Sequence, residues 1–196
     1  MPSKVPLYLS FDLETDGSSP TVSNMLSFGM VAFTASGEEV FSHQRNVLPR
    51  KDGRPEQSCL DNFWANEPEL TEYVKKDAVT PAAFVAELSD LLKAHQKGHR
   101  YVWVASPACF DWMWLKGYYE AYGPADKFPI GYQARCISSM MFFYCKTNGI
   151  SSSERAKLRK IWMDGLKHTH IPVDDAREQG HVFINLCKTA GYFPMV

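Results

Sequence analysis

The chain has 196 residues, 45% of them hydrophobic, which is long enough for one domain with a sizeable core. Its formal net charge of −1 at pH 7 argues against a protein that coats nucleic acid by charge alone, so a polyanionic substrate would have to be held locally. The N-terminus lacks the apolar stretch of a signal peptide and no run reaches membrane-spanning length, so we expect an intracellular protein, cytoplasmic or nuclear.

The five cysteines are scattered along the chain, odd in number, and include no C-x-x-C pair. This usage indicates reduced thiols rather than a disulfide framework or a zinc ribbon. The cysteines therefore offer no ligand set of their own, and any chemistry has to come from other polar residues.

The first apolar run, residues 7–17, predicts a buried strand that ends in two carboxylates. Side chains alternate along a strand, so Asp12 and Glu14 point the same way, with their backbones about 7 Å apart. Two like charges there repel each other and are costly to desolvate unless a cation lies between them. Oxygen ligands of this kind suit Mg²⁺ or Mn²⁺. The simpler alternative is an exposed strand end that happens to carry two acidic residues.

Short apolar runs predict four more strands, at residues 25–33, 40–47, 101–105 and 135–137. The short loops between the first three strands predict an antiparallel meander. The fourth strand is apolar throughout and is expected to be buried on both faces, and the fifth has the weakest pattern.

Helices are predicted from apolar spacing and from capping residues. The clearest begins with Thr80 as N-cap and Pro81 at its first position. Before it, Asp61 is a possible cap for a helix that Pro68 splits. Further helices are predicted over residues 110–119, 139–146 and 151–163, and from 172 onward. Together the elements predict a single α/β domain with a central mixed sheet.

Two later stretches carry isolated polar groups. Asp111 stands in an apolar segment just beyond the fourth strand, where helix capping is the alternative explanation. Near the C-terminus, a polar loop with His168 and His170 leads into a helix that begins with Asp174 and Asp175. Either aspartate could merely favour the positive end of the helix dipole, and helical phase does not choose between them.

In order and spacing these motifs resemble the DEDDh, or DnaQ-like, 3′–5′ exonucleases of the ribonuclease H-like superfamily. The family's D-x-E motif matches Asp12 and Glu14, its second aspartate matches Asp111, and its H-x-x-x-x-D motif matches His170 and Asp175. The resemblance covers nearly the whole chain. It implies a ribonuclease H-like fold over residues 1–196, with a five-stranded mixed sheet made of the meander and two parallel strands, flanked by helices.

The resemblance also implies a reaction: a 3′–5′ exonuclease releases nucleoside 5′-monophosphates from single-stranded DNA or RNA. Asp12, Glu14, Asp111 and Asp175 would hold two divalent cations, Mg²⁺ or Mn²⁺, and His170 would be the general base. The choice of His170 over His168, and of Asp175 over Asp174, depends on the resemblance.

Substrate contacts are predicted at the first motif and at apolar side chains near it, where bases could stack. The residues assigned to this role are Leu13, Thr15, Met25 and Trp112. Leu26 and Tyr132 are further stacking candidates, and Lys51, Arg54 and Arg135 are candidates for phosphate contacts. Core packing or simple solvation is the competing explanation for each of them.

Two other functions compete with the exonuclease. One is a catalytically inactive nucleic-acid-binding or adaptor domain of the same fold. The other is a zinc protein that uses His168, His170 and a cysteine, although no cysteine lies at a zinc-ligand spacing. The choice between DNA and RNA and the oligomeric state stay open.

Overall fold

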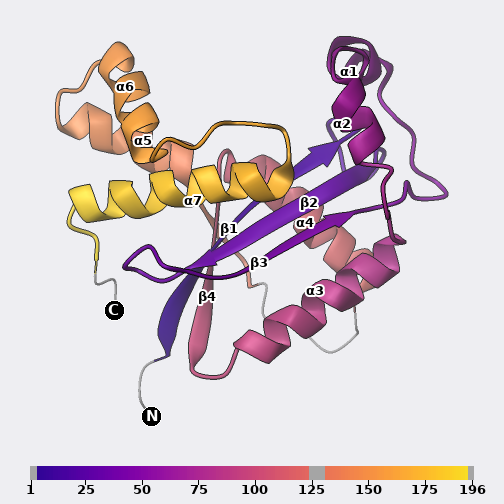
Figure 1. The fold of residues 1–196 in the computed structure, drawn as a ribbon, viewed down its shortest axis with the longest axis horizontal. Coiled ribbons are helices and arrows are strands. Elements are labelled where there is room, and N and C mark those ends of the chain that lie inside the picture. Colours follow the sequence, from indigo (N-terminus) through magenta and orange to yellow (C-terminus); the bar gives the residue numbers. More distant parts are fainter. Residues whose placement is uncertain (1–3, 124–130, 194–196) are drawn as a thin grey trace.

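A computed structural model describes residues 4–123 and 131–193, and it contains the predicted five-stranded mixed sheet between helices (Figure 1). The strand order is β3-β2-β1-β4-β5. The strands are β1 (Val5–Thr15), β2 (Met25–Phe33), β3 (Glu39–Asn46), β4 (His99–Ala105) and β5 (Ala134–Cys136). The first three strands form the antiparallel meander, β4 runs parallel to β1, and β5 runs parallel to β4. The predicted fold class is therefore confirmed.

The described helices are α1 (Gln57–Asn62), the 3₁₀ helix η1 (Trp64–Asn66), α2 (Pro68–Tyr73), α3 (Pro81–His95), α4 (Ala108–Tyr122), α5 (Ile137–Thr147), α6 (Ser152–Trp162) and α7 (Pro172–Thr189). Thr80 caps α3 as predicted, because its side-chain oxygen accepts the N–H of Ala83. The capping prediction for Asp61 is wrong, since Asp61 lies inside α1. Among the described residues, no helix combines the length and apolar character that crossing a membrane would require.

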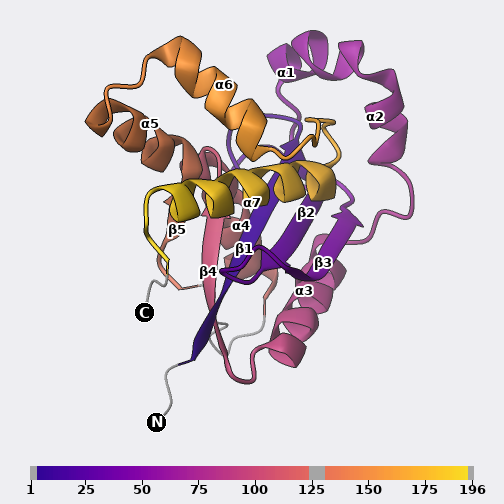
Figure 2. The ribbon, with the colours of Figure 1, turned by 60° about the vertical axis from the view of Figure 1, so that its left-hand side comes forward.

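The sheet separates two hydrophobic cores because its strand residues alternate between faces. Helices α3 and α4 cover one face, where Phe11 and Trp103 pack with Phe84 (Figure 1). Helices α5 and α7 cover the other face, with α6 packed against α7, and there Tyr8 packs against Phe183 with ring centroids 5.2 Å apart. The end of β1 lies between α1 and α2 on one side and α6 on the other, as Figure 2 shows.

Gly29 on β2 lets the start of α7 approach the sheet closely. A Cβ at this position would lie 2.0 Å from the backbone nitrogen of Val173, closer than any side chain permits. The same Val173 N–H donates a hydrogen bond to Gln44 on β3, at 2.9 Å. These contacts seat the first turn of α7 on the meander and so bring the residues of that turn to the end of β1.

Candidate active site

Carboxylates from three elements converge at the end of β1. Asp12 and Glu14 on β1 and Asp175 in the first turn of α7 each offer an oxygen, and these oxygens lie within 4.8 Å of one another. Asp111 is buried in the first turn of α4, and its charge contributes to raising the pKa of both Asp12 and Glu14. The four acidic residues of the sequence motifs therefore lie together. Alternation along β1 relates only Asp12 to Glu14, and the fold adds Asp111 and Asp175.

The site strongly disfavours its own negative charge. Burial raises the pKa of Asp12 well above its usual value, and the charges of Asp111, Glu14 and Asp175 add to this effect. Burial, followed by the charge of Asp175, raises the pKa of Glu14 to about 8. Burial raises the pKa of Asp111 to about 7. The carboxylates are therefore stabilised by a partner that neutralises them, either a proton or a cation.

The donor set fits a hard divalent cation. All four side chains offer carboxylate oxygens, which Mg²⁺ and Mn²⁺ prefer. One oxygen of Asp111, Oδ2, is buried and has no hydrogen-bond partner among the described residues, which fits an oxygen that can coordinate a cation. Asp12 is already oriented, since Gln179 donates to its Oδ1 at 2.7 Å.

The loop before α7 wraps around Asp175. The backbone N–H groups of Thr169 and His170 donate to the two carboxylate oxygens of Asp175, at 2.7 and 2.9 Å. His170 adopts the left-handed backbone conformation, with φ of 60°, which is uncommon outside glycine and is held here by its neighbours. Its Nδ1 lies 3.5 Å from Glu14 Oε1, and its ring packs edge-on against Phe63 at 5.2 Å.

His168 reaches the same cluster from a different side. Its Nδ1 lies 3.1 Å from Asp175 Oδ2 and 3.5 Å from Glu178 Oε2. Hydrogen bonds to these two carboxylates, first to Asp175, raise the pKa of His168 to about 10. His168, His170 and Asp175 form a second group with metal-binding spacing among the described residues, and no cysteine belongs to it.

The two neighbouring aspartates have different surroundings. Asp175 is completely buried among the groups just described, whereas the side chain of Asp174 is 47% exposed and pairs with Arg177 at 3.0 Å. The structure thus directs Asp175 into the cluster and Asp174 away from it.

The residues assigned to substrate contacts lie mostly in the core. Met25 is fully buried, and Leu13 is 6% exposed. The Thr15 hydroxyl donates to the Gly17 carbonyl at 2.8 Å. Trp112 is partly buried and packs against Trp103, with ring centroids 6.0 Å apart. These four side chains are therefore mostly covered by other parts of the chain, and their contact with a substrate stays a prediction.

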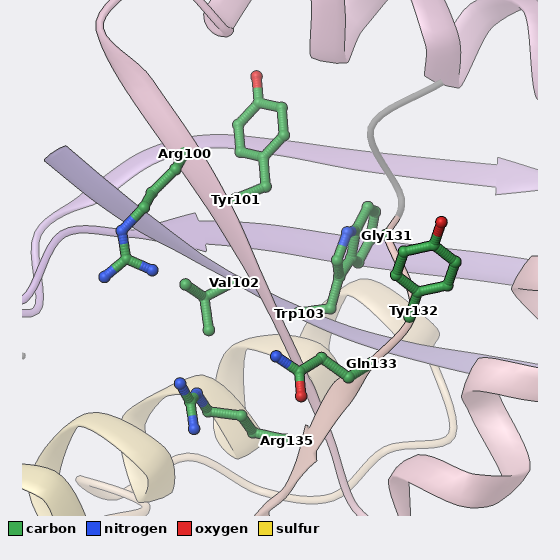
Figure 3. A pocket seen from close by; sticks show the side chains of 8 residues that line it. All are labelled: Arg100, Tyr101, Val102, Trp103, Gly131, Tyr132, Gln133 and Arg135. Atoms are coloured by element: carbon green, nitrogen blue, oxygen red, sulfur yellow. The ribbon is translucent and has the colours of Figure 1, made fainter. Parts of the chain in front are cut away.

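The remaining candidates lie elsewhere. Leu26 is partly buried and packs against the cluster of Trp64, Leu70 and Val74, while Lys51 and Arg54 are exposed in the loop before α1. Tyr132 and Arg135 line a separate pocket of about 510 Å³ along β4, together with Arg100 (Figure 3). None of the four clustered carboxylates lines that pocket.

Sequence reasoning missed Gln179 and Glu178. Glu178 is completely buried, its Oε1 accepts from Arg159 on α6, and its Oε2 faces His168. A signal existed: Glu178 follows Asp175 by one helical turn and lies on the apolar face with Val182, where an unpaired carboxylate would be costly.

Comparison with solved structures supports this fold. The zinc-bound E. coli ExoI–ssDNA complex matches with a TM-score of 0.68 and 16% identity, over 97% of this chain and 42% of that one. A full-length 3′-exonuclease matches with a TM-score of 0.64 and 15% identity, over 96% and 84%. The nuclease domain of 3′hExo, a DEDDh family member bound to rAMP, matches with a TM-score of 0.58 and 15% identity, over 96% and 94%.

These structural matches are too distant in sequence to show more than the fold, and the chain spans less than half the length of ExoI. A comparison with curated proteins gives no match. A family model does match, over residues 8–186, which is most of the chain and includes every motif described above. The chain therefore belongs to the Rv2179c-like family of 3′–5′ exoribonuclease domains, and so to the 3′–5′ exonucleases.

Proposed function

We propose that this domain hydrolyses single-stranded RNA from its 3′ end and releases nucleoside 5′-monophosphates, with the help of two divalent cations, Mg²⁺ or Mn²⁺. The observation that carries this proposal is the convergence of Asp12, Glu14, Asp111 and Asp175 at the end of β1. RNA is favoured over DNA by the description of the family as exoribonucleases.

The four carboxylates would hold the cations. When bound, a pair of such ions makes water a better nucleophile and stabilises the charge that develops on the phosphoryl oxygens. Carboxylates hold cations in their ionised form, so Asp12 and Glu14 would have to lose the protons that their raised pKa values favour. Gln179 keeps Asp12 oriented, and the N–H groups of Thr169 and His170 keep Asp175 oriented.

His170 is the general base in this mechanism. Its side chain is 37% exposed, so it can take a proton from the attacking water and pass it to solvent. Its contact with Phe63 restricts the ring, and its proximity to Glu14 holds it beside the carboxylates. His168 is engaged with Asp175 and Glu178 and is assigned no proton-transfer role.

The proposal is tested with single-stranded RNA and DNA of the same sequence, each labelled at the 5′ end. We expect stepwise shortening from the 3′ end in Mn²⁺ or Mg²⁺, faster on RNA, and no cleavage in EDTA. Binding without cleavage would support the adaptor function instead, and internal cuts would contradict an exonuclease.

A further inference from the structure

Two pockets near the carboxylates carry opposite charge. One lies beside α2 and the loop that holds Thr169, and it is lined by Glu67, Glu69 and Glu72 with Lys76 as the only basic side chain among its described lining residues. The other lies between the end of β4 and helices α5 and α6. In both ribbon views α2 and α6 lie on opposite sides of the end of β1 (Figure 1, Figure 2). A polyanion held at the carboxylates would be repelled on the α2 side.

The pocket beside α6 has the chemistry of a phosphate site. It is a cavity of about 320 Å³ over the buried side chains of Ile137 and Met141. Its polar lining residues are two arginines and three serines: Arg155, Arg159, Ser106, Ser138 and Ser152. No acidic side chain is among the described residues that line it. Guanidinium groups bind phosphate through paired N–H donors, and serine hydroxyls add further donors.

The two arginines are in different situations. Arg159 contacts the buried carboxylate of Glu178, whose other oxygen faces His168, and His168 in turn contacts Asp175. The pocket wall is therefore only a few side chains away from the carboxylate cluster. Arg155, one helical turn earlier on α6, has no hydrogen bond or ion pair from its guanidinium to another described residue. Its charge is available to a ligand.

The pocket also lies at the correct end of the sheet. Ser106 directly follows β4, and the helix after it, α4, carries Asp111. We propose that this pocket binds a phosphate of the substrate strand upstream of the linkage being cut, with Arg155 as its main contact and Arg159 shared between that phosphate and Glu178. This inference rests on the proposed function, since it assumes a single-stranded polynucleotide at the carboxylates.

Two substrates separate this inference from the proposed function. A single-stranded RNA oligonucleotide has upstream phosphates, whereas the p-nitrophenyl ester of uridine 5′-monophosphate has only the phosphodiester to be cut. Arg155→Ala should raise KM for the oligonucleotide about tenfold, as expected for one hydrogen-bonded charge, and leave kcat and the ester reaction unchanged. The dependence of log KM on log salt should become shallower by about 0.7, the value for one phosphate contact on a single strand.

Lys157→Ala is the matched control, because Lys157 is an exposed basic residue on α6 that does not line the pocket. It should leave the oligonucleotide KM close to the wild-type value. Arg159→Ala would leave the buried Glu178 carboxylate unpaired and destabilise the fold, so a loss of activity in that variant would not report on the pocket.

A single neutral methylphosphonate linkage upstream of the cut provides the complementary measurement. The neutral linkage is moved along the strand one position at a time. Where it replaces the phosphate that binds the pocket, it should raise KM for the wild type and have little further effect on KM in Arg155→Ala. The inference is overturned if Arg155→Ala behaves like Lys157→Ala, or if it slows the ester as much as the oligonucleotide. If the wild type cleaves neither substrate, it is the proposed function that fails.

Discussion

Asp174 and Asp175 follow one another in α7, yet only Asp175 faces the carboxylates. Asp175 accepts two backbone N–H groups and lies within reach of Asp12 and Glu14, while Asp174 pairs with Arg177 near the surface. At this scale the chemistry depends on burial and on direction more than on residue type.

Asp175→Asn should lower kcat by at least about a hundredfold, because it removes a charged oxygen from the group proposed to hold the cations. Asp174→Asn is the matched control and should stay close to wild type, since the surface ion pair that it breaks contributes little. Steady-state kinetics in Mn²⁺ check both variants. Equal losses in the two would mean that Asp175 has no special role.

The two histidines make a second pair. His170→Ala should lower kcat by about 10² to 10⁴, the usual contribution of a general base. His168→Ala should lower kcat much less, because the His168 ring is held by Asp175 and Glu178 and takes no proton from the attacking water in this mechanism. Circular dichroism of both variants checks that they fold. A folded His170→Ala protein with full activity would contradict the mechanism.

At the scale of elements, the site depends on how closely α7 lies on β2. Gly29 permits this approach, and the hydrogen bond between Val173 and Gln44 fixes it. The four carboxylates come from β1, α4 and α7, so their convergence is a property of sheet order and helix packing.

Gly29→Ala should therefore destabilise the protein by about 1–3 kcal/mol and lower activity, since the added methyl group meets backbone atoms of α7. Gly117→Ala in α4 is the control: its added methyl group would lie 3.6 Å from Pro20, an ordinary contact, and should be neutral or stabilising. Thermal unfolding and kcat measured together test this. Unchanged unfolding in Gly29→Ala would show that α7 does not need the close approach.

The elements with strong local signals could be predicted from the sequence. The bounds of β2 and the start of α3 at Pro81 follow from an apolar run and from the Thr80–Pro81 cap. The start of α1 could not be predicted, because its N-cap residue Glu56 makes no side-chain capping bond and instead accepts the N–H of Ser18. Local pattern misled the prediction toward Asp61.

The candidate site could be predicted only in part from local sequence patterns. Strand alternation places Asp12 and Glu14 on one face, but only the family resemblance joined them to Asp111 and Asp175. Glu178 was missed because its burial depends on α6, which supplies Arg159. Its place on the apolar face of α7 was a local signal, but the arginine that pairs with its charge comes from a different helix and could not be read from that pattern.

At the scale of the whole molecule, the crowded carboxylates should make the stability of the fold depend on pH and on bound metal. The folded-state pKa of Glu14 is raised to about 8 and that of Asp111 to about 7, so the folded protein binds protons that the unfolded chain releases. Their contribution to stability is fully present below about pH 4 and is lost as pH rises through 7 and 8.

In EDTA, the Tm should accordingly fall as pH rises from about 5 to about 8, and Mn²⁺ should restore it most at the upper end, where the carboxylates are ionised. Glu14→Gln should flatten the curve, because the substituted side chain does not titrate. Differential scanning fluorimetry over this range checks the prediction. A metal-free Tm that rises with pH would contradict it.

The most direct test compares Mn²⁺ binding with cleavage in the same preparations of wild type, Asp12→Asn and Asp111→Asn. For the wild type, calorimetry should show about two Mn²⁺ ions bound per chain, and the cleavage assay should show single-stranded RNA shortened from its 3′ end. Both properties should be lost together in the two variants, which remain folded. Wild-type protein that cleaves RNA in EDTA, or an Asp12→Asn variant that binds Mn²⁺ and cleaves like wild type, would contradict a shared metal site.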